Sequence, residues 1–348
     1  MSSIASIESP AMSEIAPDWF WSLLGIEPLA EGKSIIVGDR SLTMAGGVLR
    51  SEESVSGAQA QTQEAFGFKW AKRDTFEGEV VRNMRRWLVE KYGDIPNAPW
   101  LAEHGPHPVV LDAGCGAAMS GIALFEPILH RVRYLGVDVS TAVDVARARF
   151  TERNLSAGFI QSDLQQIPLP HGSVDLIFSE GVLHHTDDTR TALEAVLRYL
   201  KVGGRALFYV YRKKGPVREF TDDSIREKLQ AMTPDEGWAA MMPLTRLGKL
   251  LGELNIEIDI PEAVDVLEIP AGRINLQRLF YWHMFKCYYR PEMTLDEMNH
   301  INFDWYAPKN AHRQTPEEVR SWCAEFNLEI EHEVIEDAGV TIIARKIG

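Results

Sequence analysis

Short apolar runs alternate with amphipathic, helix-length stretches through the middle of this 348-residue chain. Each run has the length and the β-branched or aromatic content of a strand, and turn-forming residues flank it. The predicted strands are 108–112, 133–138, 158–162, 174–179 and 205–211. Strands that alternate with helices form a parallel sheet with helices on its faces. The pattern therefore predicts an α/β fold.

The C-terminal part of the chain has a different pattern. The runs 328–335 and 340–345 flank a turn at 336–339 and predict an antiparallel pair of strands. More than 100 residues, 212–327, separate this pair from the fifth strand. An insertion of that size is usually a functional segment or a lid. Its central helix, about 274–289, has apolar side chains on most faces, so we expect it to be buried or to line a pocket.

The N-terminal part is less regular. Residues 34–40 and 42–48 predict two short strands joined by a turn, and 51–63 have the polar composition of a linker. A helix of about 77–92 follows, with apolar side chains at helical spacing. We expect four segments: an N-terminal extension with its linker (1–63), a core (64–211), the insertion (212–327) and the last two strands (328–348).

Composition narrows the class of protein. Hydrophobic residues make up 45% of the chain and charged residues 25%, as in ordinary globular enzymes. The formal net charge of −14 weighs against a nucleic-acid partner, which normally requires a clustered basic face. Three widely spaced cysteines argue against a disulfide framework. The chain starts without the pattern of a signal peptide and has no run long enough for a membrane helix. We therefore expect a cytoplasmic protein without a membrane partner.

Two glycines follow the first strand of the core. That strand ends in Asp112, and Gly114 and Gly116 come directly after it, where they permit a tight turn and close backbone approach to a ligand. The second strand ends in another acid, Asp138. Together these features predict the first βαβ unit of a nucleotide-type cofactor site. An NAD-dependent oxidoreductase has the same features up to this point.

Further motifs follow at the ends of later strands. Asp163 follows the third strand, the segment 180–185 follows the fourth, and 202–208 leads into the fifth. In this order they resemble the class I S-adenosylmethionine-dependent methyltransferases, especially the branch of ubiquinone and menaquinone biosynthesis enzymes. The resemblance covers about 109–211. It implies a Rossmann-like, seven-stranded, mostly parallel sheet with an antiparallel last strand, extended at the N-terminus and interrupted by a mainly helical insertion. An oxidoreductase would leave Asp163 and 180–185 unexplained.

The resemblance implies S-adenosylmethionine as the cofactor and a set of residues that bind it. Asp138 should accept hydrogen bonds from the ribose hydroxyls, Asp163 should contact the adenine amino group, and Asp112 should orient the loop or meet the amino group of the cofactor. Asp163 has a second interpretation as a solvated loop acid. The whole expected set is Asp112, Gly114, Cys115, Gly116, Asp138, Val139, Ser162, Asp163, Leu164, Ser179 and Glu180.

Methyl transfer is an in-line displacement that gains most from alignment of the acceptor, and some acceptors also need a base. His184 and His185 follow the fourth strand and are candidates for that base or for positioning the acceptor; the alternative is that they only pack or hold the loop. Glu180 is a candidate for contact with cofactor or acceptor. A metal site of these histidines with Asp187 and Asp188 is rejected, because adjacent histidines point apart and the acids are placed to cap a helix.

The segment 303–313 combines aromatic, acidic and basic residues in one expected loop, before a helix at 315–326. Asp304, Tyr306 and Arg313 are candidates for holding a polar acceptor, and a packed loop with surface charges is the competing interpretation. An anionic group of the acceptor has three further candidates, namely Arg273, Arg278 and Lys286. A cluster of Phe68, Trp70 and Arg73 is a candidate lid over the cofactor. The expected catalytic set is His184, His185, Glu180, Asp304 and Tyr306.

The expected reaction moves the methyl group of S-adenosylmethionine to O, N or C of a small-molecule metabolite and releases S-adenosylhomocysteine. The acidic charge and the aromatic insertion favour an enclosed pocket over a groove for a macromolecule. Three alternatives stay open: a catalytically inactive cofactor-binding regulator or scaffold, a protein or RNA methyltransferase, and a dinucleotide oxidoreductase. We expect no metal and no nucleic acid, and a homodimer stays open.

Overall fold

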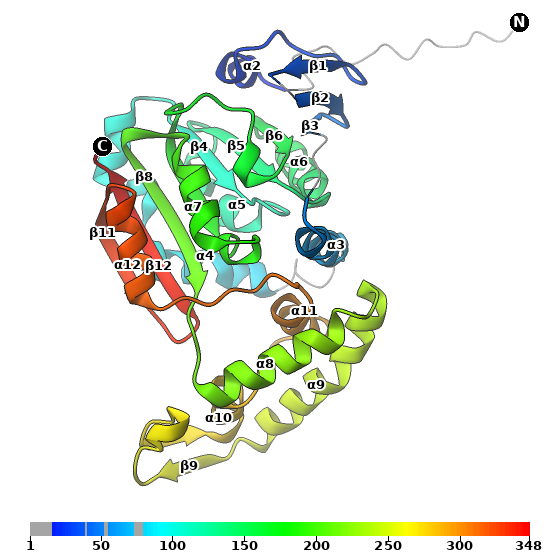
Figure 1. Ribbon diagram of the computed structural model, residues 1–348, viewed down its shortest axis with the longest axis vertical. Helices are drawn as coiled ribbons and strands as arrows, with labels where there is room; N and C mark the ends of the chain where they lie inside the picture. The colour runs from blue at the N-terminus through cyan, green and yellow to red at the C-terminus, as the bar shows by residue number, and fades with distance from the viewer. Residues whose placement is uncertain (1–15, 39, 52–54, 73–78) are drawn as a thin grey trace, which may run out of the picture.

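A computed structural model describes residues 16–38, 40–51, 55–72 and 79–348 (Figure 1). Among these residues, ten strands form one mixed sheet in the order β1-β2-β3-β6-β5-β4-β7-β8-β12-β11. The strands from β3 to β8 in this order are parallel, and β12 runs antiparallel to β8. The expected Rossmann-like α/β class with an antiparallel strand at the end is confirmed. Its sheet contains three more strands than expected.

The five central strands lie close to their predicted positions. They are β4 Val109–Ala113, β5 Arg133–Asp138, β6 Ala157–Gln161, β7 Val174–Glu180 and β8 Leu200–Tyr211. Strand β8 begins five residues earlier than predicted (205 − 200), because Leu200 already pairs with Val174 before an irregularity in the ladder. All five residues of β4 are buried, as expected for a strand covered on both faces.

Helices cover both faces of the sheet and create two hydrophobic cores. Leu111 belongs to the core that contains Leu193 of α7, whereas its neighbour Val110 belongs to the core that contains Phe125 of α5. This alternation follows from the strand geometry, in which successive side chains point to opposite faces. The helices of this part are α4 Glu79–Tyr92, α5 Met119–Phe125, α6 Ala142–Glu152, α7 Thr189–Leu197 and α12 Pro316–Glu325. Short 3-10 helices lie at Ile95–Asn97, Pro99–His104, Glu126–Ile128, Leu164–Gln166, Leu183–His185 and Asp265–Leu267.

The N-terminal segment extends the main sheet. It contains helix α2 Asp18–Leu24 and the strands β1 Ser34–Val37, β2 Arg40–Ala45 and β3 Val48–Ser51. We expected two strands, but Gly46 and Gly47, with φ of 62° and 69°, turn the chain inside the second one. Strand β3 pairs in parallel with β6, so this segment joins the edge of the core.

Helix α2 packs on the sheet through Phe20. The Phe20 side chain is fully buried and lies against Gly158 of β6; a Cβ atom at Gly158 would stand 2.2 Å from the Phe20 ring. The contact therefore requires glycine at position 158, and it links the N-terminal segment to the core strand that precedes Asp163.

Residues 57–63 of the predicted linker 51–63 are helical, which corrects the expectation for this part. Helix α3 spans Gly57–Ala71, and the Ser56 hydroxyl caps it by accepting a hydrogen bond from the Gln59 N–H at 2.9 Å. The Gln and Ala residues that look like a polar linker are good helix formers. Gln61 donates to the carbonyl oxygen of Ala307 at 2.9 Å, so tertiary contacts hold this helix in place.

The insertion lies beyond the carboxyl end of β8, below the sheet in Figure 1. Its elements are α8 Pro216–Leu229, α9 Pro234–Leu254, the hairpin β9 Glu257–Ile260 with β10 Gly272–Asn275, α10 Leu276–His283 and α11 Leu295–Tyr306. Buried polar groups fix these helices to one another. Asp222 of α8 accepts hydrogen bonds from the indole of Trp305 at 2.7 Å and the hydroxyl of Tyr306 at 2.8 Å, both on α11.

Two expectations for the insertion are wrong in detail. The predicted helix 274–289 forms only over α10, because partners from elsewhere replace helical hydrogen bonds after His283. The backbone N–H of Lys286 donates to the Tyr306 hydroxyl at 2.7 Å, and that of Tyr288 donates to the Asn302 side chain at 2.9 Å. The expected loop from 303 is the last turn of α11, which begins at a capping box of Thr294 and Glu297.

The end of the chain agrees with the sequence pattern. Strands β11 Leu328–Ile335 and β12 Gly339–Lys346 form the predicted antiparallel pair. The predicted helix 315–326 is α12, which packs on this pair through Val319 and Cys323. Both side chains are buried in the core that also contains Val340, so the last strands complete one face of the sheet.

Replacing Phe20 by alanine tests the attachment of the N-terminal segment. We expect Phe20→Ala to lower the free energy of unfolding by about 3–5 kcal/mol, because the substitution empties a fully buried site against the glycine of β6. Chemical denaturation followed by circular dichroism measures the change. The control Ile36→Ala, at a side chain that is 76% exposed, should change the stability by less than about 0.5 kcal/mol. Equal effects of the two variants would contradict this packing.

Candidate active site

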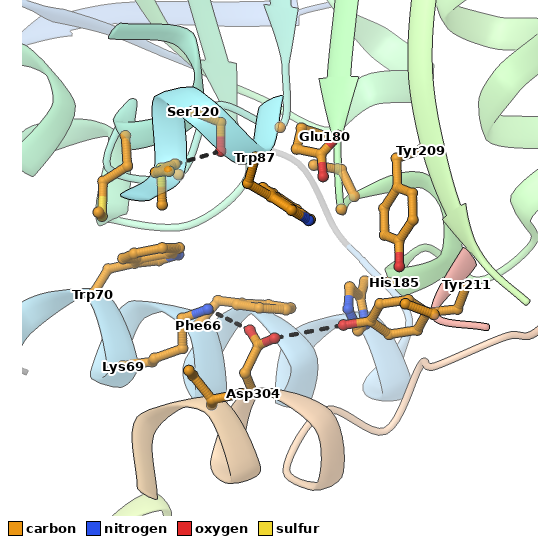
Figure 2. A pocket seen from close by; sticks show the side chains of 18 of the residues that line it. Phe66, Lys69, Trp70, Trp87, Ser120, Glu180, His185, Tyr209, Tyr211 and Asp304 are labelled. Atoms are coloured by element: carbon orange, nitrogen blue, oxygen red, sulfur yellow. Dashed lines mark hydrogen bonds and ion pairs between the residues drawn. The ribbon is translucent and has the colours of Figure 1, made fainter. Parts of the chain in front are cut away.

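A cavity of about 1240 Å³ lies at the carboxyl ends of the parallel strands, between the core, helices α3 and α4, and the insertion. Figure 2 shows its centre: Phe66, Lys69 and Trp70 of α3 on one side, Glu180 at the end of β7, and Tyr209 and Tyr211 of β8 opposite. Ligands bind in this place in open α/β sheets, because strand ends and loops converge there. The cavity is the candidate active site.

The glycine loop after β4 forms part of the cavity wall. Gly114 and Gly116 have φ of 83° and 50°, in the region that favours glycine. The backbone N–H groups of Gly114 and Cys115 both donate to the carbonyl oxygen of Val137, at 2.7 and 2.9 Å, and so tie the loop to β5. A Cβ atom at Gly114 would stand 2.1 Å from Val182, so a larger residue does not fit.

Asp112 lies buried at the end of β4 and lines the cavity. Its carboxylate accepts a hydrogen bond from the hydroxyl of Tyr134. Burial raises the pKa of Asp112 to about 7, and the Tyr134 hydrogen bond only partly offsets this. A carboxyl group held in this way is ready to meet a cation in the cavity.

Asp138 ends β5 and orders the loop around it. Its Oδ1 accepts hydrogen bonds from the N–H and the hydroxyl of Ser140, at 2.8 and 2.6 Å, and its Oδ2 accepts one from the N–H of Gly116 at 2.8 Å. A carboxylate offers about four acceptor positions, so these bonds leave room for about one more. Burial raises the pKa of Asp138 despite these hydrogen bonds. Val139 also lines the cavity.

The residues after β6 are divided between the cavity and the protein interior. Asp163 and Leu164 line the cavity, and Asp163 also caps the short helix that follows, accepting from the Gln165 N–H at 2.7 Å. Ser162 is buried and does not line it; its hydroxyl donates to backbone carbonyls of the same turn.

Glu180 is held firmly at the end of β7. Lys91 and Tyr92, the last two residues of α4, each donate a hydrogen bond of 2.5 Å to one carboxylate oxygen of Glu180. The side chains of Lys91 and Glu180 are 1% and 6% exposed, so this is a buried ion pair. Burial lowers the pKa of Lys91, and Glu180 works against that change. The preceding residue, Ser179, is fully buried outside the cavity and donates to the Ala113 carbonyl.

The paired histidines have different surroundings. His184 is fully buried, lies 3.7 Å from the Tyr211 ring between centroids, and does not line the cavity; neither ring nitrogen has a partner among the described residues. His185 lines the cavity, and its Nδ1 lies 2.6 Å from the carbonyl oxygen of Asn310. Because a carbonyl only accepts, Nδ1 carries the proton and Nε2 is left as an acceptor. Burial lowers the pKa of His185 to about 4.

Of the candidates on α11, one lines the cavity and the other lies in the protein interior. Asp304 lines the cavity, pairs with the ammonium group of Lys69, and has the Tyr211 hydroxyl at 3.5 Å (Figure 2). Burial would raise the pKa of Asp304, but the charges of Lys69, His185 and Lys286 together hold it below its usual range. Tyr306 is fully buried outside the cavity, where it bonds to Asp222.

The basic candidates for binding an anionic group are separated in space. Arg278 and Lys286 line the cavity. Arg273 lies on the exposed hairpin strand β10 with its side chain 71% exposed, and Arg313 pairs with Glu219 and Asp223 outside the cavity. Only two of these four basic residues can therefore reach a ligand in it.

Of the two aromatic residues expected to form a lid over the cofactor, only one lines the cavity. Trp70 lines the cavity at the glycine loop, where its Nε1 would stand 3.0 Å from a Cβ atom at Gly116. Phe68 does not line the cavity and packs against Phe303 and Trp238. Arg73 lies outside the described residues.

Several residues of the site did not stand out in the sequence: Lys69 and Tyr209 line the cavity, whereas Lys91 and Tyr92 do not line it and hold Glu180. Lys69, Lys91, Tyr92 and Tyr209 take part in the site through contacts with segments far away in the sequence. Lys91 illustrates the reason, since its ammonium group lies 3.5 Å from the centroid of the Tyr209 ring, 118 residues later (209 − 91). The only signal for Lys91 and Tyr92 was a polar side chain at the end of an amphipathic helix.

The acids after the histidines serve the backbone. Asp188 caps α7 by accepting from the Thr191 N–H at 2.7 Å, as predicted. Asp187 accepts from the Ser56 hydroxyl at 2.8 Å and the Asn310 amide at 2.9 Å. Within the described part of the chain, no cluster of three or more His, Cys, Asp or Glu side chains is arranged to hold a metal ion.

Residues 111–208 match a protein family described as methyltransferase domain. The chain contains a methyltransferase domain. This domain is of the S-adenosylmethionine-dependent methyltransferase type, and S-adenosylmethionine is the cofactor of such domains. The matched residues begin in β4 and end in β8, so they contain the glycine loop and the strand-end acids described above.

Relatives match the same kind of domain over a limited length. An uncharacterised methyltransferase of Bacillus subtilis (strain 168), YcgJ, is 35% identical over 115 residues, which cover 32% of this chain and 43% of that protein. The ubiquinone/menaquinone biosynthesis C-methyltransferase UbiE of Xanthomonas campestris is 32% identical over 108 residues, or 30% of this chain and 43% of that enzyme. The similarity thus spans less than half of either relative.

Among solved structures, the 1,6-didemethyltoxoflavin-N1-methyltransferase of Burkholderia thailandensis is similar with a TM-score of 0.44 and 14% identity, over 92% of this chain and 100% of that one. No helix in the described part of the chain is long and apolar enough to cross a membrane.

The residues of the methyltransferase domain fit its cofactor. The positive-φ glycine loop lets the backbone come close to a ligand, and three acids at strand ends, Asp112, Asp138 and Asp163, line the cavity beside it. Asp138 retains an acceptor position for a hydroxyl group, and the carboxyl of Asp112 is free to meet an ammonium group on one oxygen. Leu164 and Trp70 supply apolar surface for a flat ring.

His300, buried between aromatic side chains near the cavity, should make stability depend on pH. Burial lowers the pKa of His300 to about 3 from its ordinary value of 6.5. The unfolded chain therefore binds the proton first as the pH falls, and stability is lost below pH 6.5. Between pH 7 and pH 5, protonation of this residue in the unfolded chain lowers the free energy of unfolding by about 2 kcal/mol. We expect His300→Gln to cost less stability at pH 5 than at pH 7, measured by denaturation at both values. A penalty that stays constant or grows at pH 5 would contradict this.

Proposed function

We propose that the protein transfers the methyl group of S-adenosylmethionine to an oxygen, nitrogen or carbon atom of a small molecule and releases S-adenosylhomocysteine. One observation carries the proposal: the glycine loop, the strand-end acids and the aromatic residues of the insertion line the same cavity. Its volume of about 1240 Å³ exceeds the usual size of a single-ligand pocket, roughly 300–1000 Å³, and leaves space for a cofactor and an acceptor together.

The strand-end acids would bind the cofactor. Asp138 would accept a hydrogen bond from a ribose hydroxyl at its remaining acceptor position. Asp163 and Leu164 would contact the adenine. Asp112 would face the amino group of the cofactor. The roles proposed for Ser162 and Ser179 are indirect, since their hydroxyls bind the backbone and hold the two turns in shape.

The cofactor supplies an electrophilic methyl group on a sulfonium ion, and the residues around it supply alignment. Glu180 would present a fixed carboxylate toward the positive charge, because Lys91 and Tyr92 hold both of its oxygens. The rings of Trp87 and Tyr209 line the cavity near Glu180 and would exclude water from the reacting atoms (Figure 2). Exclusion of water strengthens electrostatic interactions within such a site.

His185 is the proposed contact for the acceptor. Its Nε2 is an acceptor at neutral pH, so it would take a hydrogen bond from an acceptor O–H or N–H and direct the opposite lone pair toward the methyl group. With a pKa of about 4, His185 is a weak base, and positioning is its main proposed role. His184 and Tyr306 lie outside the cavity and would support it by packing.

Replacing Asp138 by asparagine tests the cofactor site. We expect Asp138→Asn to weaken binding of S-adenosylhomocysteine at least tenfold, because a charge-assisted hydrogen bond to the ribose contributes about 1.5–3 kcal/mol. Calorimetric titration measures the dissociation constant. The control Asp144→Asn removes an acid of the next helix that pairs with Arg50 and does not line the cavity, so its affinity should equal that of the wild type. Unchanged binding in Asp138→Asn would contradict the assignment.

A screen for acceptors tests the reaction itself. The purified protein is incubated with S-adenosylmethionine and a panel of phenols, amines, heteroaromatic compounds and acidic C–H compounds, and release of S-adenosylhomocysteine is measured. We expect turnover with at least one small molecule and its loss in Asp138→Asn. Tight cofactor binding without turnover on any acceptor would favour a regulator or scaffold. Turnover only with a protein or RNA would replace the small-molecule assignment.

A further inference from the structure

Lys286 is a buried cation that lines the cavity. It follows α10, and the residue is only 7% exposed. Its ammonium group lies 4.8 Å from the centroid of the Trp305 ring, and in the described part of the chain it has neither an ion pair nor a hydrogen bond. A buried charge without an opposite charge is unfavourable, so this position calls for a partner.

The acids close to Lys286 are already engaged. Asp304 pairs with Lys69, and Asp222 accepts hydrogen bonds from Arg218, Trp305 and Tyr306. Two further cations act on the group from α8, namely Arg218 and Arg226. Burial lowers the pKa of Lys286 to about 7; Asp304 and Asp222 oppose the change and the two arginines add to it. An anion in the cavity would restore the charge balance.

Helix α10 adds a second cation and two aromatic side chains to the same wall. Arg278, Tyr281 and Trp282 project from this helix into the cavity lining. Among the described residues Arg278 has no carboxylate partner, and the hydroxyl groups of Tyr281 and of Tyr209 have no hydrogen bond. Three further acids that line the cavity, Glu292, Glu336 and Asp337, are exposed to solvent.

We propose that the methyl acceptor is an aromatic small molecule with an anionic group, a carboxylate or a phosphate, and that this group binds Lys286 and Arg278. This inference rests on the proposed function, since it concerns the acceptor half of the same cavity. The ring would lie against Tyr281 and Trp282, and the Tyr209 hydroxyl would donate to a polar atom of the acceptor.

Charge and burial favour an anion over a neutral group. Hydrogen bonds between an ammonium or guanidinium group and a carboxylate or phosphate are about twice as strong as neutral ones. The attraction grows further where side chains exclude water. A neutral acceptor would leave Lys286 either with a buried charge that has no ion pair in the described part of the chain or without its proton, whereas an anion favours the charged form. An acceptor that were itself a cation would meet repulsion from Lys286 and Arg278 on this wall.

Calorimetric titration of the protein saturated with S-adenosylhomocysteine tests the inference. The probes are 4-hydroxybenzoate, phenyl phosphate and, as the neutral counterpart of the first, 4-hydroxybenzamide. We expect at least one anionic probe to bind, with at least tenfold higher affinity than the amide. The two anions distinguish a carboxylate site from a phosphate site. In Lys286→Met, which keeps the apolar part of the side chain, affinity for the anion should fall at least tenfold.

Matched variants separate this effect from misfolding. Lys249→Met removes an exposed lysine of α9 that pairs with Glu253 outside the cavity, and it should bind the anion as the wild type does. All variants should bind S-adenosylhomocysteine with wild-type affinity, which shows that the cofactor half is folded.

Three results would overturn the inference: equal affinity for the anion and the amide, no binding of any anionic probe, or unchanged anion binding in Lys286→Met. A wild-type protein that does not bind S-adenosylhomocysteine would contradict the proposed function itself. The two failures are thus distinguishable, because the first set leaves cofactor binding intact.

Discussion

The ion pair between Lys69 and Asp304 joins two helices across one side of the cavity (Figure 2). The residues lie 235 positions apart in the chain, on α3 and α11, and their side chains are 6% and 26% exposed. Separating them would leave a charge in the interior without its partner, which typically costs 3–5 kcal/mol. The insertion is therefore held against the core where His185, Tyr211 and the strand ends meet.

The same pair contributes to the distribution of charge within the cavity. Burial raises the pKa of Asp138 on the cofactor side, and Lys69 opposes that rise; burial lowers the pKa of Lys286 on the insertion side, and Asp304 opposes that fall. Acids thus line the cavity at the strand ends, whereas the cations Lys286 and Arg278 line it on the insertion. This separation suits a positively charged cofactor at one end and an anionic acceptor at the other, and it would orient both before reaction.

Local patterns predicted the core strands well and the site only in part. Strand ends in a parallel sheet meet at one edge, so Asp112, Asp138 and Glu180 could be placed together from sequence. Whether a neighbouring side chain faces the cavity depends on packing that no local pattern encodes. Ser179 and Tyr306 bind groups in the interior, and His184 stacks on Tyr211, although all three stand beside cavity residues in the sequence. We therefore propose that these three residues support the site by packing or by holding the backbone, without contact with a ligand.

The sequence by itself determined the α/β class, the cofactor and the order of the strand-end acids. The class and the order of the acids depend on residues close together in the chain, through alternation of side chains and the φ preference of glycine, and the cofactor followed from the resemblance of the ordered motifs to a known family. Tertiary structure decided the rest. It ended the predicted helix 274–289 at His283, because Tyr306 and Asn302 take the backbone N–H groups of Lys286 and Tyr288. It also placed the Lys286 ammonium group in the cavity without an ion pair to any acid in the described part of the chain. Such partners come from segments far away in the chain, and only the folded protein brings them together.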